Sequence, residues 1–186
     1  THIMTKQTIL ITGCSHGGIG YATAKYLHEL GHIVFASVRR QAELDQLTAE
    51  GINTYLLDVC DYKQFDNVLE QVLEKTGGTL DVLFNNAGYG QAGALEDIET
   101  KYLIEQFNTN VFGLHHATRQ VMKVMRKQGY GKIIQHSSVL GLVTMRYRGA
   151  YCASKYAIEG ITDVMRQELA GSNIFMSSLN TGPVTS

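Results

Sequence analysis

Residues 137–155 read Ser-Ser-Val-Leu-Gly-Leu-Val-Thr-Met-Arg-Tyr-Arg-Gly-Ala-Tyr-Cys-Ala-Ser-Lys, and they join an apolar strand to the start of a helix. Tyr151 and Lys155 lie one helical turn apart, and side chains four positions apart share one face of a helix. The ammonium of Lys155 would therefore favour the ionised phenol of Tyr151, which makes that phenol a candidate proton donor and acceptor near neutral pH. Ser138, on the preceding element, could hydrogen-bond the group that is being protonated.

The Tyr-x-x-x-Lys spacing is unspecific by itself. The chain has ten tyrosines, and Tyr21 with Lys25 repeats the spacing on a segment that we assign to a helix surface. A short motif of this kind gains weight only from its structural context. The surrounding sequence therefore decides how residues 151–155 are interpreted.

Short apolar runs alternate with helical patterns along the whole chain. Each predicted strand is almost entirely apolar, which indicates a parallel sheet covered by helices on both faces. No repeat or linker interrupts the pattern, so the sequence predicts one doubly wound α/β domain. The predicted strands are residues 8–12, 33–38, 54–57, 80–84, 132–135 and 174–179, and the predicted helices are residues 21–30, 41–50, 65–73, 99–128 and 150–170.

Composition excludes several classes of protein. The 186 residues are 44% hydrophobic, which is enough for one buried core, and a net charge of −1 without a basic stripe argues against nucleic-acid binding. The three cysteines share no C-x-x-C spacing and are predicted to be reduced thiols of a cytoplasmic protein. The seven histidines form no H-E-x-x-H pair, so no metal site is predicted. No apolar run approaches about 18 residues, so no membrane span is expected.

A glycine cluster follows the first predicted strand and precedes the first predicted helix. Gly13, Gly17, Gly18 and Gly20 would let the backbone approach a pyrophosphate closely, and the free N–H groups at the helix start attract negative charge. The alternative is a glycine-rich turn that binds nothing, but this position favours a dinucleotide site. A P-loop is excluded because no Gly-Lys-[Ser/Thr] follows.

Two arginines follow the second predicted strand. Arg39 and Arg40 stand just beyond Ser37, where NAD-binding folds usually carry an acidic residue for the ribose hydroxyls. A small hydroxyl with two guanidinium groups suits a 2′-phosphate, which favours NADP(H) over NAD(H). The alternative is that both arginines only form a solvated strand end.

These pieces together resemble the short-chain dehydrogenase/reductase family over nearly the whole chain. Each piece is modest alone, but they occur in the family's order and on the expected elements. The matching pieces are Thr12-Gly13-Cys14-Ser15, Gly18-Ile19-Gly20, Asp58-Val59, Asn85-Asn86-Ala87-Gly88, Asn110, Ser138, Tyr151 with Lys155, and Thr181-Gly182-Pro183-Val184.

The resemblance implies four catalytic residues. Tyr151 would be the acid and base, and Lys155 would bind the nicotinamide ribose and support the ionised tyrosine. Ser138 would orient the substrate carbonyl, and Asn110 would help to hold a water of the proton relay.

The resemblance also implies a set of cofactor-binding residues. Asp58 would contact the adenine, residues 86–88 would form the cofactor floor, and residues 182–184 would flank the nicotinamide. The full expected set is Gly13, Ser15, His16, Gly17, Gly18, Ile19, Gly20, Arg39, Arg40, Asp58, Val59, Asn86, Ala87, Gly88, Tyr151, Lys155, Gly182, Pro183 and Val184.

The chain departs from the family pattern in two places. Thr181 stands where a proline is expected, and the glycine spacing fits only if one extra residue is accommodated around His16 and Gly17. The implied fold is a Rossmann-like, three-layer sheet of strand order 3-2-1-4-5-6. We expect residues 1–4 to be a vector remnant with the start methionine. Residues 5–186 would then be one C-terminally incomplete domain that lacks the last strand and the substrate segment.

Within the family, the chain is similar to the branch of retinol and 17β-hydroxysteroid dehydrogenases and acyl-dihydroxyacetone-phosphate reductases. The resemblance implies NADP(H)-dependent hydride transfer to or from the carbonyl or alcohol of a hydrophobic small molecule, by a homodimer or homotetramer. The alternative is a catalytically silent NAD(P)-binding regulatory or scaffold protein, because fold does not dictate function.

Overall fold

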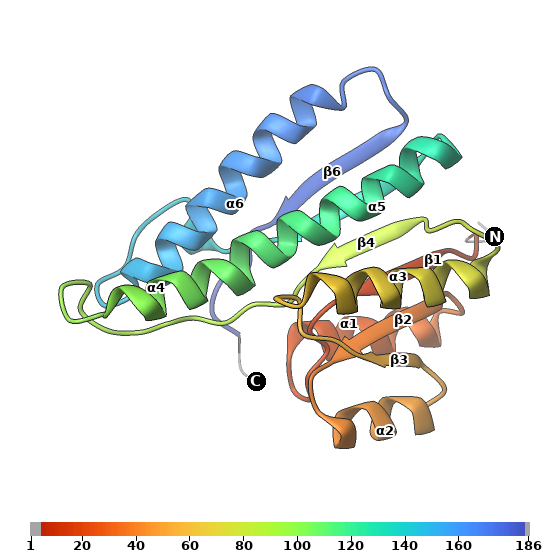
Figure 1. The fold of residues 1–186 in the computed structure, drawn as a ribbon, viewed down its shortest axis with the longest axis horizontal. Helices are drawn as coiled ribbons and strands as arrows, with labels where there is room; N and C mark the ends of the chain where they lie inside the picture. The colour runs from red at the N-terminus through yellow and green to blue at the C-terminus, as the bar shows by residue number, and fades with distance from the viewer. Residues whose placement is uncertain (1–4, 185–186) are drawn as a thin grey trace.

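Six short strands form one parallel sheet in the computed structural model, which describes residues 5–184 (Figure 1). The strand order β3-β2-β1-β4-β5-β6 confirms the predicted order. The expected vector remnant at residues 1–4 lies outside the described residues. The strands are β1 (Thr8–Ile11), β2 (Ile33–Val38), β3 (Asn53–Leu56), β4 (Val82–Asn85), β5 (Gly131–His136) and β6 (Ile174–Leu179).

Alternate residues of the central strands pack into two different hydrophobic cores. Leu10 of β1 belongs to one core, whereas its neighbours Ile9 and Ile11 belong to the other. Successive side chains of a strand point to opposite faces of the sheet. The apolar runs in the sequence are therefore explained by burial on both faces.

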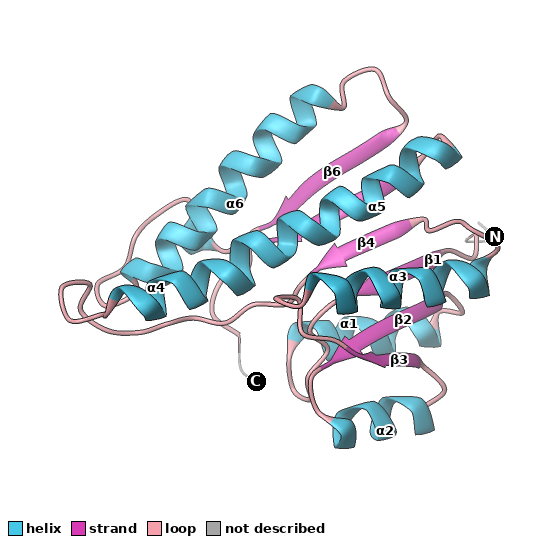
Figure 2. Cartoon of the chain, viewed as in Figure 1, coloured by secondary structure: helices cyan, strands magenta, loops and turns pink. Residues whose placement is uncertain are grey.

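Helices cover both faces of the sheet (Figure 2). Ala24 of α1 (Ile19–Glu29) and Leu47 of α2 (Gln41–Ala49) belong to the core of Ile9 and Ile11. The opposite core contains residues of α3 (Tyr62–Thr76) and α5 (Leu114–Gln128), and Met165 of α6 (Gly149–Glu168) packs against it. None of the helices within residues 5–184 is both long and apolar enough to cross a membrane.

Local capping shifts two helix starts from the predicted positions. Helix α1 begins at Ile19, two residues earlier than predicted, and Gly18, whose backbone is extended, is its N-cap residue. Helix α3 begins at Tyr62 because the side chain of Asp61 accepts a hydrogen bond from the amide of Gln64 at 2.9 Å. It ends at Thr76, before Gly77 in the left-handed conformation.

The helix predicted for residues 99–128 contains a widened turn. It consists of α4 (Thr100–Phe107), the π-helical segment η1 (Asn108–Gly113) and α5. A π-turn often marks a functional position in a helix. The same turn brings the backbone of Gly113 close to the loop after β3, since a Cβ there would lie 2.8 Å from the carbonyl oxygen of Val59.

We predict that Gly113→Ala destabilises the fold. The methyl group would meet a backbone oxygen that cannot move alone, so overpacking should lower the unfolding free energy by about 1–3 kcal/mol. The matched control is Gly160→Ala in α6, which meets no atom within 4 Å and should stabilise the helix by about 0.5–1 kcal/mol. Urea unfolding measures both variants, and equal effects would contradict the prediction.

Candidate active site

The predicted site residues gather at the carboxyl edge of the sheet. Because all neighbouring strands are parallel, the loops that follow them leave the sheet on the same side (Figure 1). Ligands of open α/β sheets bind at this edge, where the strand order reverses. Here the reversal lies between β1 and β4, which carry the glycine cluster and the Asn85–Gly88 motif.

The glycine loop accommodates its extra residue in a tight turn. The amide of Gly18 donates to the carbonyl of Ser15 at 3.1 Å, and Gly17 between them has a φ of +80°. Such a turn needs a residue that tolerates positive φ, which is why glycine stands there. His16 protrudes from the turn and its ring packs against Tyr21, with 4.9 Å between the ring centroids.

Hydrogen bonds from the end of β4 fix the glycine loop. The side-chain oxygen of Thr12 accepts the amides of Asn86 and Ala87, at 3.1 and 3.0 Å. In return, the Asn86 side-chain nitrogen donates to the carbonyls of Thr12 and Gly13, at 3.0 and 2.8 Å. Asn86 was expected in the cofactor floor, and its side chain braces the loop from within the protein. Thr12 was quoted in the family motif but was not predicted as a site residue.

The start of α1 fits the diphosphate of a dinucleotide. Gly18 caps the helix without a side-chain hydrogen bond, and no acidic residue occupies the first turn. The amides of that turn therefore have no side-chain acceptor, and the helix dipole favours an anion there. Close packing also requires glycine at the loop, since a Cβ on Gly13 would lie 2.6 Å from the Cα of Ala87.

The two arginines after β2 differ in their surroundings. Arg40 forms an ion pair with Glu43, with 2.5 Å between Nη2 and Oε1. The hydrogen bond from Arg40 lowers the pKa of the buried Glu43 carboxyl, and Ser15 also donates to it at 3.4 Å. Arg39 is exposed and forms no ion pair within residues 5–184. Sequence reasoning missed Glu43, although its spacing of three from Arg40 in a helix start is a usable signal.

The residues after β3 have separate environments. Asp58 is exposed, and one of its carboxylate oxygens accepts the amide of Cys60 at 2.9 Å. Val59 is buried and packs against Gly113 of the π-helical segment. Of these two expected site residues, Asp58 therefore has an exposed side chain and Val59 does not.

Tyr151 and Lys155 occupy one face of the first turns of α6. The Lys155 ammonium lies 5.4 Å from the centroid of the Tyr151 ring and donates to the carbonyl of His136 at 2.7 Å. Burial lowers the pKa of Lys155 from 10.5 to about 8, although the charge of Glu159 opposes this shift. Tyr21 and Lys25, the other pair with the Tyr-x-x-x-Lys spacing, lie on α1. Nζ of Lys25 forms an ion pair with Oε2 of Glu50 at 3.0 Å.

Ser138 lies between the end of β5 and the short 3-10 helix η2 (Val139–Gly141), of which it is the N-cap residue. Its side-chain oxygen accepts the amide of Leu140 at 3.1 Å and lies 3.5 Å from the carbonyl of Thr181. No hydrogen bond joins Ser138 to Tyr151 among the described residues. The serine is therefore held by its own strand end and by the segment after β6.

The side chain of Asn110 forms three hydrogen bonds with other groups of the protein. Its oxygen accepts the amide of Tyr89 at 3.1 Å, and its nitrogen donates to the Tyr89 carbonyl and to Ser154, at 2.9 and 3.1 Å. Ser154 in turn donates to the carbonyl of Tyr151 at 2.7 Å. Asn110 therefore supports the helix turn that carries Tyr151, through Ser154.

The segment after β6 contacts the end of β5 and the residues that follow it through Thr181. The hydroxyl of Thr181 lies 2.9 Å from Nε2 of His136, and its carbonyl accepts the amide of Val139 at 3.0 Å. The expected residues Gly182, Pro183 and Val184 are exposed beside it. His136 was not predicted as a site residue, because nothing local in the sequence indicates its contacts.

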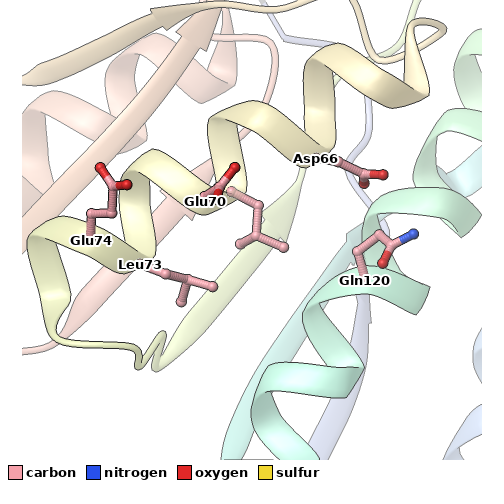
Figure 3. A pocket seen from close by; sticks show the side chains of 6 residues that line it. Asp66, Glu70, Leu73, Glu74 and Gln120 are labelled. Atoms are coloured by element: carbon pink, nitrogen blue, oxygen red, sulfur yellow. The ribbon is translucent and has the colours of Figure 1, made fainter.

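A separate hollow of about 510 Å³ lies between α3 and α5 (Figure 3). Acidic side chains of α3 point along it, and none of the predicted site residues lines it. Within residues 5–184, no group of three or more histidine, cysteine and acidic side chains is arranged to hold a metal ion. The lining residues are Asp66, Leu69, Glu70, Leu73, Glu74 and Gln120.

Residues 7–186 match the family described as short chain dehydrogenase. An uncharacterized oxidoreductase of Escherichia coli, YbbO, is 37% identical over 99% of this chain and 70% of its own length. A 3-ketodihydrosphingosine reductase of Bacteroides thetaiotaomicron is 39% identical, and the match covers 89% of this chain and 60% of that protein. Human retinol dehydrogenase 8 is 35% identical over 96% of this chain and 59% of its own length.

The expected branch is confirmed, since relatives include this retinol dehydrogenase and a 1-acyldihydroxyacetone phosphate reductase of Schizosaccharomyces pombe. Among solved structures, ElxO with bound NADP superposes with a TM-score of 0.89 and 29% identity, over 96% of this chain and 74% of that one. A Burkholderia phymatum short chain dehydrogenase/reductase in complex with NAD superposes with a TM-score of 0.87 and 28% sequence identity. The match covers 96% of this chain and 66% of that one.

We predict that the titration of Lys155 changes stability between about pH 8 and pH 10.5. The unfolded chain binds this proton more tightly than the folded chain, so the unfolding free energy should rise with pH in this window. The difference in unfolding free energy between the wild type and Lys155→Met isolates the contribution of this proton. That difference should change by at most about 3 kcal/mol across the window. Urea unfolding at pH 7 to 10.5 measures it, and a pH-independent difference between the two proteins would contradict the buried ammonium.

Proposed function

Because this chain belongs to the short chain dehydrogenase family, we propose that it is an oxidoreductase that interconverts the carbonyl and alcohol of a hydrophobic small molecule with NADP(H). The observation that supports this proposal most directly is the pairing of Tyr151 with the buried Lys155 at the carboxyl edge of the sheet. The chain spans 60% of the Bacteroides reductase and 59% of the human dehydrogenase, so the activity of the whole protein is part of the proposal.

The protein groups supply the proton and the alignment. A bound nicotinamide would provide or accept the hydride. Tyr151 donates a proton to the carbonyl oxygen during reduction and takes it back during oxidation. Lys155, held by the carbonyl of His136, keeps a positive charge beside the phenol, and Ser138 orients the substrate oxygen through its hydroxyl.

Apolar side chains near the catalytic residues support a hydrophobic substrate. Leu142, Val143, Met145 and Tyr147 follow Ser138 on one loop and are all more than half exposed. Leu95 is also exposed, and it lies against Gly149 at the start of the helix that carries Tyr151. Exposed apolar patches commonly mark binding sites, and the named substrates of several relatives are lipids.

The preference for NADP(H) over NAD(H) rests mainly on Arg39. This guanidinium is exposed after β2 and has no carboxylate partner in the described part of the chain, so it is available for a 2′-phosphate. Arg40 has its charge partly neutralised by Glu43 and would contribute less. Similar structures carry NADP in one case and NAD in another, so the proposed preference is argued from Arg39 and Arg40 of this chain alone.

A homo-oligomer in the cytoplasm is part of the same proposal. A groove of about 560 Å³ between α5 and α6 is lined by apolar residues such as Met122, Ile161 and Val164, with Arg119 and Glu168 beside them. Burial of this groove against a second copy would cover apolar surface and pair the charges. The three cysteines are free, as expected for a reducing compartment.

We predict that Tyr151→Phe lowers turnover by about 10²–10⁴-fold while NADPH affinity stays within a few-fold, because the variant lacks only the proton-donating group. Steady-state reduction of a ketone panel and a fluorescence titration with NADPH measure the two quantities. The matched control is Tyr156→Phe, which removes an exposed hydroxyl from the same helix and should leave turnover unchanged.

Near-normal turnover of Tyr151→Phe would contradict the catalytic role of Tyr151. Tight NADPH binding by the wild type without turnover of any carbonyl would instead favour the alternative of a silent NAD(P)-binding protein.

We predict that Arg39→Ala weakens NADPH binding by about 10–100-fold and leaves NADH binding nearly unchanged. The loss corresponds to a charge-assisted hydrogen bond to the 2′-phosphate, worth about 1.5–3 kcal/mol. Arg40→Ala serves as the comparison and should weaken NADPH binding less, because the Arg40 guanidinium is already paired with Glu43. Titrations with both cofactors test this, and equal losses for NADPH and NADH would contradict the phosphate contact.

A further inference from the structure

One imidazole connects three segments of the candidate site. His136 is the last residue of β5, and its Nδ1 lies 2.8 Å from the side-chain oxygen of Asn86. Its Nε2 lies 2.9 Å from the hydroxyl of Thr181, and its backbone carbonyl accepts the ammonium of Lys155 at 2.7 Å. The ends of β4, β5 and β6 and the catalytic helix therefore meet at this residue.

The surrounding groups determine which nitrogen of His136 carries the proton. The amide nitrogen of Asn86 faces the carbonyls of Thr12 and Gly13, which can only accept hydrogen bonds. The side-chain oxygen of Asn86 consequently faces the imidazole, and it too can only accept. Nδ1 of His136 must therefore be the donor in this pair.

The second nitrogen of the ring must then accept a hydrogen bond from Thr181. Burial and the charge of Lys155 lower the pKa of His136 to about 4, so the ring is neutral near pH 7. A neutral ring with a protonated Nδ1 carries a lone pair on Nε2. The result is a chain of hydrogen bonds with one direction, from the Thr181 hydroxyl through His136 and Asn86 to the carbonyl of Gly13.

This series of hydrogen bonds explains why a threonine occupies position 181. A proline, which the family pattern places there, has no side-chain donor and would leave Nε2 of His136 unpaired. The backbone of Thr181 is held as well, because its carbonyl accepts the amide of Val139 at 3.0 Å. Thr181 thus connects residues 182–184 to the strand end that carries Ser138.

We propose that Thr181 and His136 are positioning residues that fix the nicotinamide-flanking segment relative to the glycine loop before a dinucleotide binds. This inference rests on the proposed function for its ligand, whereas the hydrogen-bond chain itself exists in the free protein. Preorganisation reduces the ordering cost of binding. Loss of the hydrogen-bond chain should therefore weaken binding of the nicotinamide half of the cofactor and leave binding of the adenosine half unchanged.

The test compares Thr181→Val, which removes the hydroxyl at nearly constant shape, with Thr181→Ser, which retains it. NADPH and 2′,5′-ADP, which lacks the nicotinamide half, are titrated against each variant and the wild type. Thr181→Val should bind NADPH about tenfold more weakly and 2′,5′-ADP as the wild type does, since residues 182–184 are then no longer held in place before the nicotinamide half binds. Thr181→Ser should restore NADPH affinity to within about twofold of the wild type.

Equal losses for both ligands, no loss for either, or failure of Thr181→Ser to restore affinity would overturn the positioning role. Unchanged binding of 2′,5′-ADP also shows that Thr181→Val is folded.

A readout without cofactor separates this inference from the proposed function. Long-range ¹H–¹⁵N spectra of the free protein should show His136 as the tautomer protonated at Nδ1, and the Nε2 resonance should shift in Thr181→Val. The opposite tautomer would overturn the hydrogen-bond chain. Failure of the wild type to bind either ligand, with the predicted tautomer present, would overturn the proposed function alone.

Discussion

The parallel pairing of β1 with β4 is the constraint on which the candidate site depends. Ile11 lies opposite Phe84 in this pairing, so the chain after β1 meets the chain after β4 at the edge of the sheet. There Thr12 and Asn86 exchange hydrogen bonds through both their side chains and their backbones. Without Asn86, two carbonyls of the loop would lose their partner, and each unpaired buried group costs about 1–3 kcal/mol. The shape of the glycine loop follows from this contact.

The part of the candidate site around Tyr151 and Lys155 depends on β5 in the same way. Lys155 is buried and carries a charge that water would otherwise solvate, and the carbonyl of His136 provides a compensating hydrogen bond. The same residue contacts Asn86 through its ring. The glycine loop and the Tyr151–Lys155 pair are thus joined by a short path of hydrogen bonds through Asn86 and His136, and the candidate site is one connected structure.

Much of the fold followed from local patterns in the sequence. Apolar runs gave the strands, and glycines gave most helix ends, because burial on both faces and positive backbone φ are local requirements. Boundaries shifted where a side chain intervened, as Asp61 does at the start of α3. The π-turn around Asn110 was not predicted, and it accompanies the close approach of Gly113 to Val59, a residue distant in sequence.

The sequence by itself determined the types of residue and their spacing: Tyr151 and Lys155 one helical turn apart, and glycines at a strand-to-helix turn. Such features need only the geometry of one helix or one loop. Only the tertiary structure decided that Asn86 hydrogen-bonds the glycine loop and that His136 contacts Thr181. These two contacts join residues 45 or more positions apart in sequence, and they form only because parallel strands bring their carboxyl ends to one edge.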